Sequence, residues 1–321
     1  MRGDGGSADA EMAVGVRVAR HAASARARRV RGIAVAALLA GSVGPALAVE
    51  VPPAMEDKSR YTLADPTPDR LLRDLSTDRP DMTESPFTVD AGRVQTETNL
   101  FGYARSRPEA DGTVTSVYEF ATTNIRVGLT HDTEIDVIWQ PYGIVRARPR
   151  DPLAATRQAG VGSIDLRAKI NLWGNDTFAA PGATALALLP FVTLPTDRGN
   201  GIGAAAVEAG LIVPLAVKLS DQIGLGLNAG MHVRKDDPTV GYHVEWLASA
   251  SLAYEWTERF GSYVEVATRL GTRDPRGDVV LVGLGLAYKV HRNLQLDAGV
   301  NLGVTPAASR INPFVGVSAR F

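Results

Sequence analysis

The chain of 321 residues contains no cysteine, which excludes disulfide bridges, zinc–cysteine sites and thiol nucleophiles. Its 34 Lys and Arg are balanced by 35 Asp and Glu, so it lacks the basic surplus that nucleic-acid binding requires, and we expect no nucleic-acid partner. Past the N-terminal region there is no apolar run long enough for a transmembrane helix. The sequence does have 32 glycines and a hydrophobic fraction of 45%, too apolar for a disordered chain.

The first 48 residues have the pattern of a secretory signal peptide. An arginine-rich stretch precedes an apolar run over 32–43, and Ala46-Leu47-Ala48 follows as a cleavage motif. The apolar core of about 12 residues is shorter than the roughly 20 that a membrane anchor needs. We therefore expect residues 1–48 to be removed on export, whether translation starts at Met1 or Met12.

Residues 49–91 are rich in proline and charge, and they are predicted to form a periplasmic leader or plug without a core of its own. From Gly92 onward, polar and apolar residues alternate with a period of two, which indicates strands. Twelve strands are predicted, at 92–104, 114–129, 135–145, 161–172, 183–194, 204–219, 223–233, 242–256, 261–270, 278–290, 294–304 and 312–321.

The predicted fold is all-β: a transmembrane antiparallel up-and-down β-barrel of about 12 strands over residues 92–321. An even number of strands brings both ends to the periplasmic side. Trp246 and Trp256 share one face ten residues apart, as at the two edges of an apolar membrane band, and the chain ends on an alternating strand with Phe321. A soluble sandwich is the alternative. The connection over 173–182 is long for a periplasmic turn.

Hairpin lengths and strand parity give specific pairings and orientations. Glu119 takes outward parity, and His232 is expected opposite His243 in the lumen near the outer rim, as a pH- or metal-responsive constriction or as a neutral hydrogen-bonded pair. The predicted cross-strand pairs are Leu219 with Ile223, Val217 with Leu225, Val290 with Leu294, Tyr288 with Leu296, Val127 with Val137 and Ile125 with Trp139.

A specific sequence block lies in the leader, Thr-Asp-Arg-Pro-Asp-x-Thr-Glu-Ser-Pro over residues 77–86. It consists of Thr77, Asp78, Arg79, Pro80, Asp81, Thr83, Glu84, Ser85 and Pro86. With later pieces such as Leu-Pro-Phe-Val-Thr-Leu-Pro at 189–195, it resembles the outer-membrane family described as "putative MetA-pathway of phenol degradation" over residues 66–321. The resemblance implies an outer-membrane barrel linked to uptake of aromatic or apolar compounds, with no catalytic residues.

Charged residues of both signs take inward parity. They are Glu97, Arg126, Asp136, Asp165, Arg167, Lys169, Glu208, Glu245, Glu265, Arg269, Lys289, Asp297 and Arg320, together with His232 and His243. They line either a polar conduit or a narrow barrel filled with salt bridges. Mixed charge argues against a strongly ion-selective pore.

The predicted function is passive or facilitated passage of small, aromatic or apolar molecules through the outer membrane. The alternatives are a plugged structural barrel without transport and an outer-membrane lipid-modifying enzyme. The enzyme is disfavoured because no Ser–His dyad is evident beside His232 or His243. No cofactor or metal is expected. The expected partners are outer-membrane lipid, the barrel assembly machinery acting on Phe321 as an assembly signal, and a solute that the sequence does not name.

Overall fold

The computed structural model describes residues 57–197, 202–236, 241–271 and 277–321, so the predicted signal peptide lies outside the described residues. The regular structure of these residues is almost entirely strand, as the period of two predicts. The strands are β1 (Val94–Arg105), β2 (Val114–Gly128), β3 (Thr133–Trp139), β4 (Tyr142–Arg148), β5 (Thr156–Gly160), β6 (Ile164–Trp173), β7 (Thr184–Leu194), β8 (Glu208–Lys218), β9 (Ile223–Lys235), β10 (Tyr242–Glu255), β11 (Phe260–Gly271), β12 (Val279–His291), β13 (Leu294–Gly303) and β14 (Ile311–Arg320). Two short 3₁₀ turns, η1 (Asp69–Leu71) and η2 (Pro152–Ala154), complete the elements.

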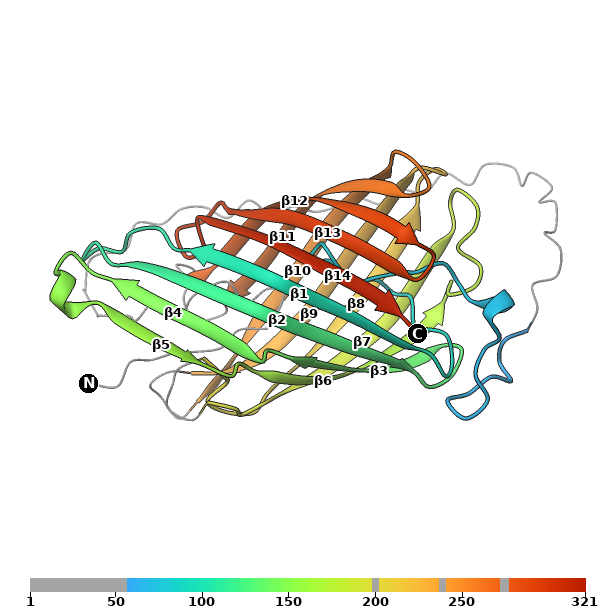
Figure 1. The fold of residues 1–321 in the computed structure, drawn as a ribbon, viewed down its shortest axis with the longest axis horizontal. Coiled ribbons are helices and arrows are strands. Elements are labelled where there is room, and N and C mark those ends of the chain that lie inside the picture. The colour runs from blue at the N-terminus through green and yellow to red at the C-terminus, as the bar shows by residue number, and fades with distance from the viewer. Residues whose placement is uncertain (1–56, 198–201, 237–240, 272–276) are drawn as a thin grey trace.

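The strands close into a barrel, because β1 pairs with both β2 and β14 in an otherwise sequential antiparallel order (Figure 1). β3 and β4 both pair with β2 and form one broken strand of the wall, and β6 and β5 pair with them in the same way. The wall therefore has twelve positions, which confirms the predicted twelve-stranded antiparallel barrel.

The two faces of the wall differ in polarity, as the alternation requires. In β6, Lys169 is fully buried while Leu166 on the other face is 44% exposed. Trp246 and Trp256 are both exposed on the outer face of the barrel. An apolar exterior around a polar interior is typical of a barrel surrounded by lipid.

One of the predicted hairpin registers is confirmed in full and a second in part. Val217 pairs with Leu225, and the Leu219 amide donates to the Ile223 carbonyl. Tyr288 pairs with Leu296, but the next pair is His291 with Leu294, so the predicted pairing of Val290 was wrong. A register shift after Lys289 leaves Val290 as an extra residue.

The predicted register of the 125–139 hairpin was wrong by two residues. Val127 pairs with Ile135, and Ile125 pairs with Val137. The turn is tighter than predicted, because the Leu129 amide already donates to the Thr133 carbonyl. A shift of two keeps each side chain on its predicted face.

Glu119 points inward and is 5% exposed, so its predicted outward orientation was wrong. The cause is Ala121, a non-glycine residue with φ of +54°, which reverses the alternation of β2 midway. β1 has a register shift at the same level, between Asn99 and Phe101. Alternation alone does not reveal such a position.

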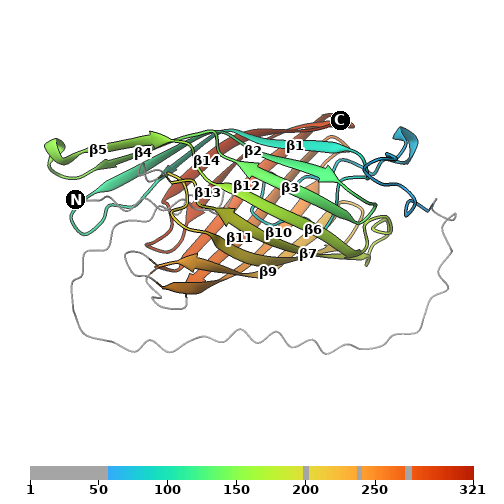
Figure 2. The same ribbon diagram turned by 90° about the horizontal axis from the view of Figure 1, so that it is seen from below.

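The β4–β5 hairpin extends beyond the rest of the wall, at the end away from the C-terminus (Figures 1 and 2). Among the described residues, β5 pairs with β4 alone, and β7 ends at Leu194 opposite Ile164 of β6. The hairpin thus stands above the closed part of the barrel.

Candidate functional site

Residues 76–90, here called the lumen segment, lie inside the barrel. Asp78 bonds to Lys169 of β6, Thr83 to Ser249 of β10, and Arg79 to Asp297 of β13. Because these three strands lie apart around the wall, the segment that contacts all of them crosses the interior. The sequence block that carries the family resemblance therefore supplies the residues that attach the lumen segment to the inner wall.

Asp78 binds Lys169 and Arg126 of the wall, two buried cations that are here called the cationic seat. Its carboxylate accepts from Lys169 Nζ at 2.7 Å and lies 3.2 Å from Arg126 Nη1. Arg126 is itself fully buried and also pairs with Glu97 and Glu134, each at 2.7 Å. Glu97 in turn accepts from the Asp78 amide at 3.0 Å.

The same seat gathers Asp78, Glu134 and Asp136 so that one oxygen of each lies within 4.8 Å of the others. Arg126 and Lys169 supply two buried positive charges at the same place. These two cations offset part of the negative charge of the carboxylates, and buried charges need such partners.

Arg79 makes the second attachment. Its Nη2 donates to Asp297 Oδ1 at 2.6 Å and its Nε to Oδ2 at 3.3 Å, a two-point contact with both side chains buried. The guanidinium lies against Gly316 of β14, where any side chain would collide with it. Phe314 covers the cation at 5.6 Å.

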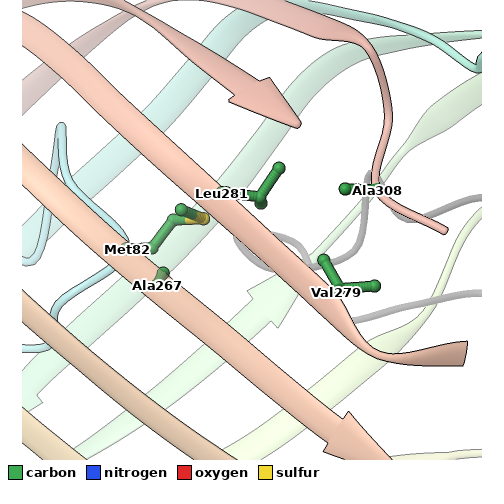
Figure 3. Close-up of a cluster of buried hydrophobic side chains, with 5 residues drawn as sticks. All are labelled: Met82, Ala267, Val279, Leu281 and Ala308. Carbon is green, nitrogen blue, oxygen red and sulfur yellow. The ribbon is translucent and has the colours of Figure 1, made fainter. Parts of the chain in front are cut away.

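Met82, Thr83 and Glu84 make the third attachment. The Met82 amide and the Thr83 hydroxyl both donate to Glu265, and Thr83 Oγ1 lies 2.8 Å from Ser249 Oγ. The Met82 side chain packs with Ala267, Val279, Leu281 and Ala308 on the β11–β12 side (Figure 3). Arg167 of β6 pairs with Glu84.

The long connection over 174–183 binds the leader at the end of the barrel that holds the C-terminus (Figure 1). Asp176 accepts from Arg73 Nε at 2.8 Å and from Lys58 Nζ at 2.7 Å, and Phe178 contacts Phe87 edge to face. Burial opposes ionisation of Asp176, but the hydrogen bond and charge of Arg73, assisted by Lys58, hold its pKa below its ordinary value. The unexpected length of this connection is thus explained by the leader that it holds.

The predicted face-to-face pairing of His232 and His243 was wrong. His232 pairs with Glu245 and His243 with Arg234, because the strands continue two residues further, to Lys235 opposite Tyr242. His232 Nε2 lies 3.5 Å from Glu208, whereas His243 contacts Asp236 at 2.8 Å. Carboxylates and Arg234 separate the imidazoles.

One part of the inner wall is apolar. Leu189, Ile212 and Leu247 face inward in one cross-strand row that passes through Gly230, and Phe191 packs with them. Near the end of the barrel that holds the C-terminus, Gly224 also faces inward, and an added Cβ there would meet nothing within 4 Å. The inner face therefore borders open space at Gly224, and it carries the apolar row farther along the barrel, at Gly230.

The other predicted inward residues are also found on the inner face, but they are not gathered into one site. Asp165 lies 3.7 Å from Arg167, and Arg320 reaches Asp90 of the lumen segment at the same distance. Glu245 pairs with Arg234 and Arg269 near the outer end, away from the seat of Asp78. Lys289 is half-buried in β12, opposite Gln295.

Sequence reasoning missed Glu134, Arg234 and Gln95 among the inward polar residues. Glu134 and Arg234 fell just outside strands whose predicted ends were two residues short, so their parity was not read. Gln95 bonds to the Ser76 carbonyl and to Glu97. The charges of residues 77–86 complement the charges predicted on the inner face of the barrel. A comparison of the two sets would have indicated that this segment enters the lumen, but not which residues pair.

Comparisons with known proteins agree with this architecture. A family model described as "putative MetA-pathway of phenol degradation" matches residues 77–321, beginning at the first residue of the sequence block. The COG4313 outer membrane channel from Pseudomonas putida F1 superposes with a TM-score of 0.56 at 11% identity, covering 77% of this chain and 100% of that chain. The transport unit of the autotransporter AIDA-I from Escherichia coli gives a TM-score of 0.46 at 10% identity, covering 77% and 93%. The search of curated proteins returned no match.

The first of these structures, at so low an identity, supports the barrel fold alone. The family match is broader, because it covers more than half of the chain and includes both the lumen segment and every strand of the wall. The chain therefore belongs to the family described as "putative MetA-pathway of phenol degradation".

Proposed function

We propose that this chain is an outer-membrane barrel that passes small apolar molecules, aromatic ones included, and that the lumen segment is its gate. The observation that carries the proposal is the inward apolar row of Leu189, Ile212 and Leu247. The interior of a membrane barrel is ordinarily polar. A row of large apolar side chains on that face favours solutes that are themselves apolar.

The position of the lumen segment supports a gating role. Along β9 the inward residues run from Gly224, beside open space, through Gly226 and Asn228 to Gly230 in the apolar row. Thr83 lies between these levels, since a Cβ on Gly226 would approach its Cγ2 to 3.0 Å. A solute moving along this side of the lumen, between the periplasmic space and the apolar row, would pass Thr83.

Membership of the family adds the chemical class, because its description refers to phenol degradation. Outer-membrane residence belongs to the same proposal, with lipid around the apolar exterior and the barrel assembly machinery as the partner that recognises Phe321. An apolar outer face with Trp246 and Trp256 exposed upon it supports this residence.

A plugged structural barrel is the second candidate, and the buried charge pairs favour it. Arg126, Lys169 and Arg79 each hold the lumen segment or its seat by contacts of 2.6–2.7 Å between buried groups. If these attachments never release, the lumen stays closed to solutes.

Flux measurements on barrels reconstituted in vesicles separate the two candidates. A small aromatic solute is expected to enter faster than a sugar of similar size. Leu247→Asn and Ile212→Asn, which keep the number of side-chain heavy atoms while making the row polar, should slow the aromatic solute selectively. Ile138→Asn, a matched change at a buried, inward residue of β3, should leave that preference intact.

Equal slowing of both solutes by all three variants would contradict the proposed path, because it would indicate general disruption. Absence of flux for every solute, with a barrel that is folded by its heat-modifiable gel mobility, would establish the plugged structural barrel instead.

A further inference from the structure

The outer surface of the extended hairpins carries an arginine row that the proposed function does not use. Arg105 pairs with Ser116, Ser116 with Arg146, and Arg146 with Arg157, so the four residues form one cross-strand row over β1, β2, β4 and β5. Their side chains point outward, since the alternate residues Ala104 and Thr115 are buried.

Like charges directly opposite each other in a sheet repel, and Arg146 and Arg157 are such a pair. Within the described ranges, none of Arg105, Arg146 and Arg157 forms an ion pair with a carboxylate. The wall thus holds three positive charges in register, none of them ion-paired among the described residues, an arrangement that an external anion would stabilise.

An aromatic belt lies directly beneath this row. Tyr103 contacts Tyr118 with ring centroids 5.1 Å apart, and Phe101, Phe120 and Tyr142 continue the belt one step nearer the periplasm. Aromatic girdles mark the level of lipid headgroups in membrane barrels. The arginine row therefore lies at or just above the headgroups of the outer leaflet.

The guanidinium of Arg146 is also held in position, because it stacks over the Tyr118 ring at 5.2 Å. A stacked guanidinium keeps its edge free for a forked hydrogen bond, and phosphate oxygens accept such bonds well. Ser116, between Arg105 and Arg146, offers a hydroxyl donor in the same row.

We propose that Arg105, Ser116, Arg146 and Arg157 bind the phosphate groups of the phosphorylated glycolipid that forms the outer leaflet, with its acyl chains against the aromatic belt. The inference rests on the proposed outer-membrane residence. It concerns the outside of the wall, so it is independent of the gate and of the solute.

The test compares thermal unfolding of barrels folded in vesicles of phosphatidylcholine alone, with lipid A, or with lipid A stripped of phosphate. Phosphorylated lipid A should raise the unfolding midpoint of the wild type by several degrees, and high salt should reduce that rise. In R105Q/R146Q/R157Q the rise should be lost. R259Q, which removes an exposed arginine from a periplasmic turn, should retain it.

In phosphatidylcholine alone the order of the two unfolding midpoints should reverse, because the triple variant no longer carries the repulsion between Arg146 and Arg157. There it should unfold at or above the wild-type midpoint, and solute flux should be unchanged. This flux measurement keeps the inference separate from the proposed transport.

An undiminished rise in the triple variant would overturn the inference. So would an equal rise with dephosphorylated lipid A, or one reproduced by inorganic phosphate at the same phosphate concentration. If the wild type fails to fold into any vesicle, the failure belongs to the proposed membrane residence.

Discussion

Replacing Asp297 by Asn should release the lumen segment at Arg79. The substitution keeps the size of the side chain but removes the charge that receives both Arg79 hydrogen bonds, and both side chains are nearly inaccessible to solvent. Removing one partner of a buried ion pair typically costs about 3–5 kcal/mol, because the remaining charge stays buried after losing that partner. Solvent screening does not reduce this figure at so buried a site.

That energy shifts the balance between the seated and the displaced lumen segment by roughly a hundredfold to a few thousandfold. Single-channel recording in a planar bilayer should therefore show frequent, larger openings in the Asp297→Asn protein where the wild type is mostly closed. Asp69→Asn is the matched control, because Asp69 also accepts from an arginine, Arg93, at 2.6 Å but is 80% exposed. Exposed pairs contribute only about 0.2–1 kcal/mol.

The double variant Arg79→Met/Asp297→Asn tests the physical reason. With the cation gone as well, that contact no longer buries a charge, so closure should be partly restored. The reasoning would be refuted if Asp297→Asn conducted like the wild type, or if Asp69→Asn opened the barrel equally.

Three further changes are expected to have measurable results. Ala121→Gly should raise the free energy of unfolding by about 1 kcal/mol, measured by denaturant titration in detergent, because glycine adopts the positive φ without the strain that alanine carries; a loss of stability would contradict this. The folded pKa of Asp176 is depressed, so its hold on Arg73 is complete above its unfolded pKa near 4 and is lost as pH falls through the lower folded value. Channel openings of the wild type should therefore become more frequent when the buffer on the periplasmic side of the bilayer is strongly acidic. Asp176→Asn should show the same frequent openings already at neutral pH. Identical pH responses of the two proteins would exclude this attachment. Deletion of Phe321 should impair assembly far more than the loss of one exposed apolar contact, and unchanged yield of the heat-modifiable form would argue against a terminal assembly signal.

The architecture was predictable because the period of two persists wherever one face meets an apolar phase. Lys169 and Leu172 in β6 show this contrast directly, and no distant contact was needed to assign their faces. Predictions of side-chain orientation and strand pairing were wrong where the period of two is interrupted or a hairpin is longer than predicted. Ala121 reverses the face of Glu119, and the longer β9–β10 hairpin moves His232 away from His243.

The path of the lumen segment was not predictable in the same way. Its attachments join residues far apart in the chain, such as Arg79 with Asp297 and Thr83 with Ser249. Local periodicity assigns a side chain to a face of the sheet, but it does not predict which inward charge pairs with which residue of the leader. The sequence allowed a plug as one reading of residues 49–91, and the pairings required the folded chain.

The most direct test locks the lumen segment in place. The chain has no cysteine, so Thr83→Cys with Ser249→Cys, whose hydroxyl oxygens lie 2.8 Å apart in the wild type, offers one defined disulfide. Aromatic solute flux is then measured in the same vesicles before and after reduction. The gating account predicts little flux when the disulfide is closed and wild-type flux after reduction, and equal flux in both states would contradict it.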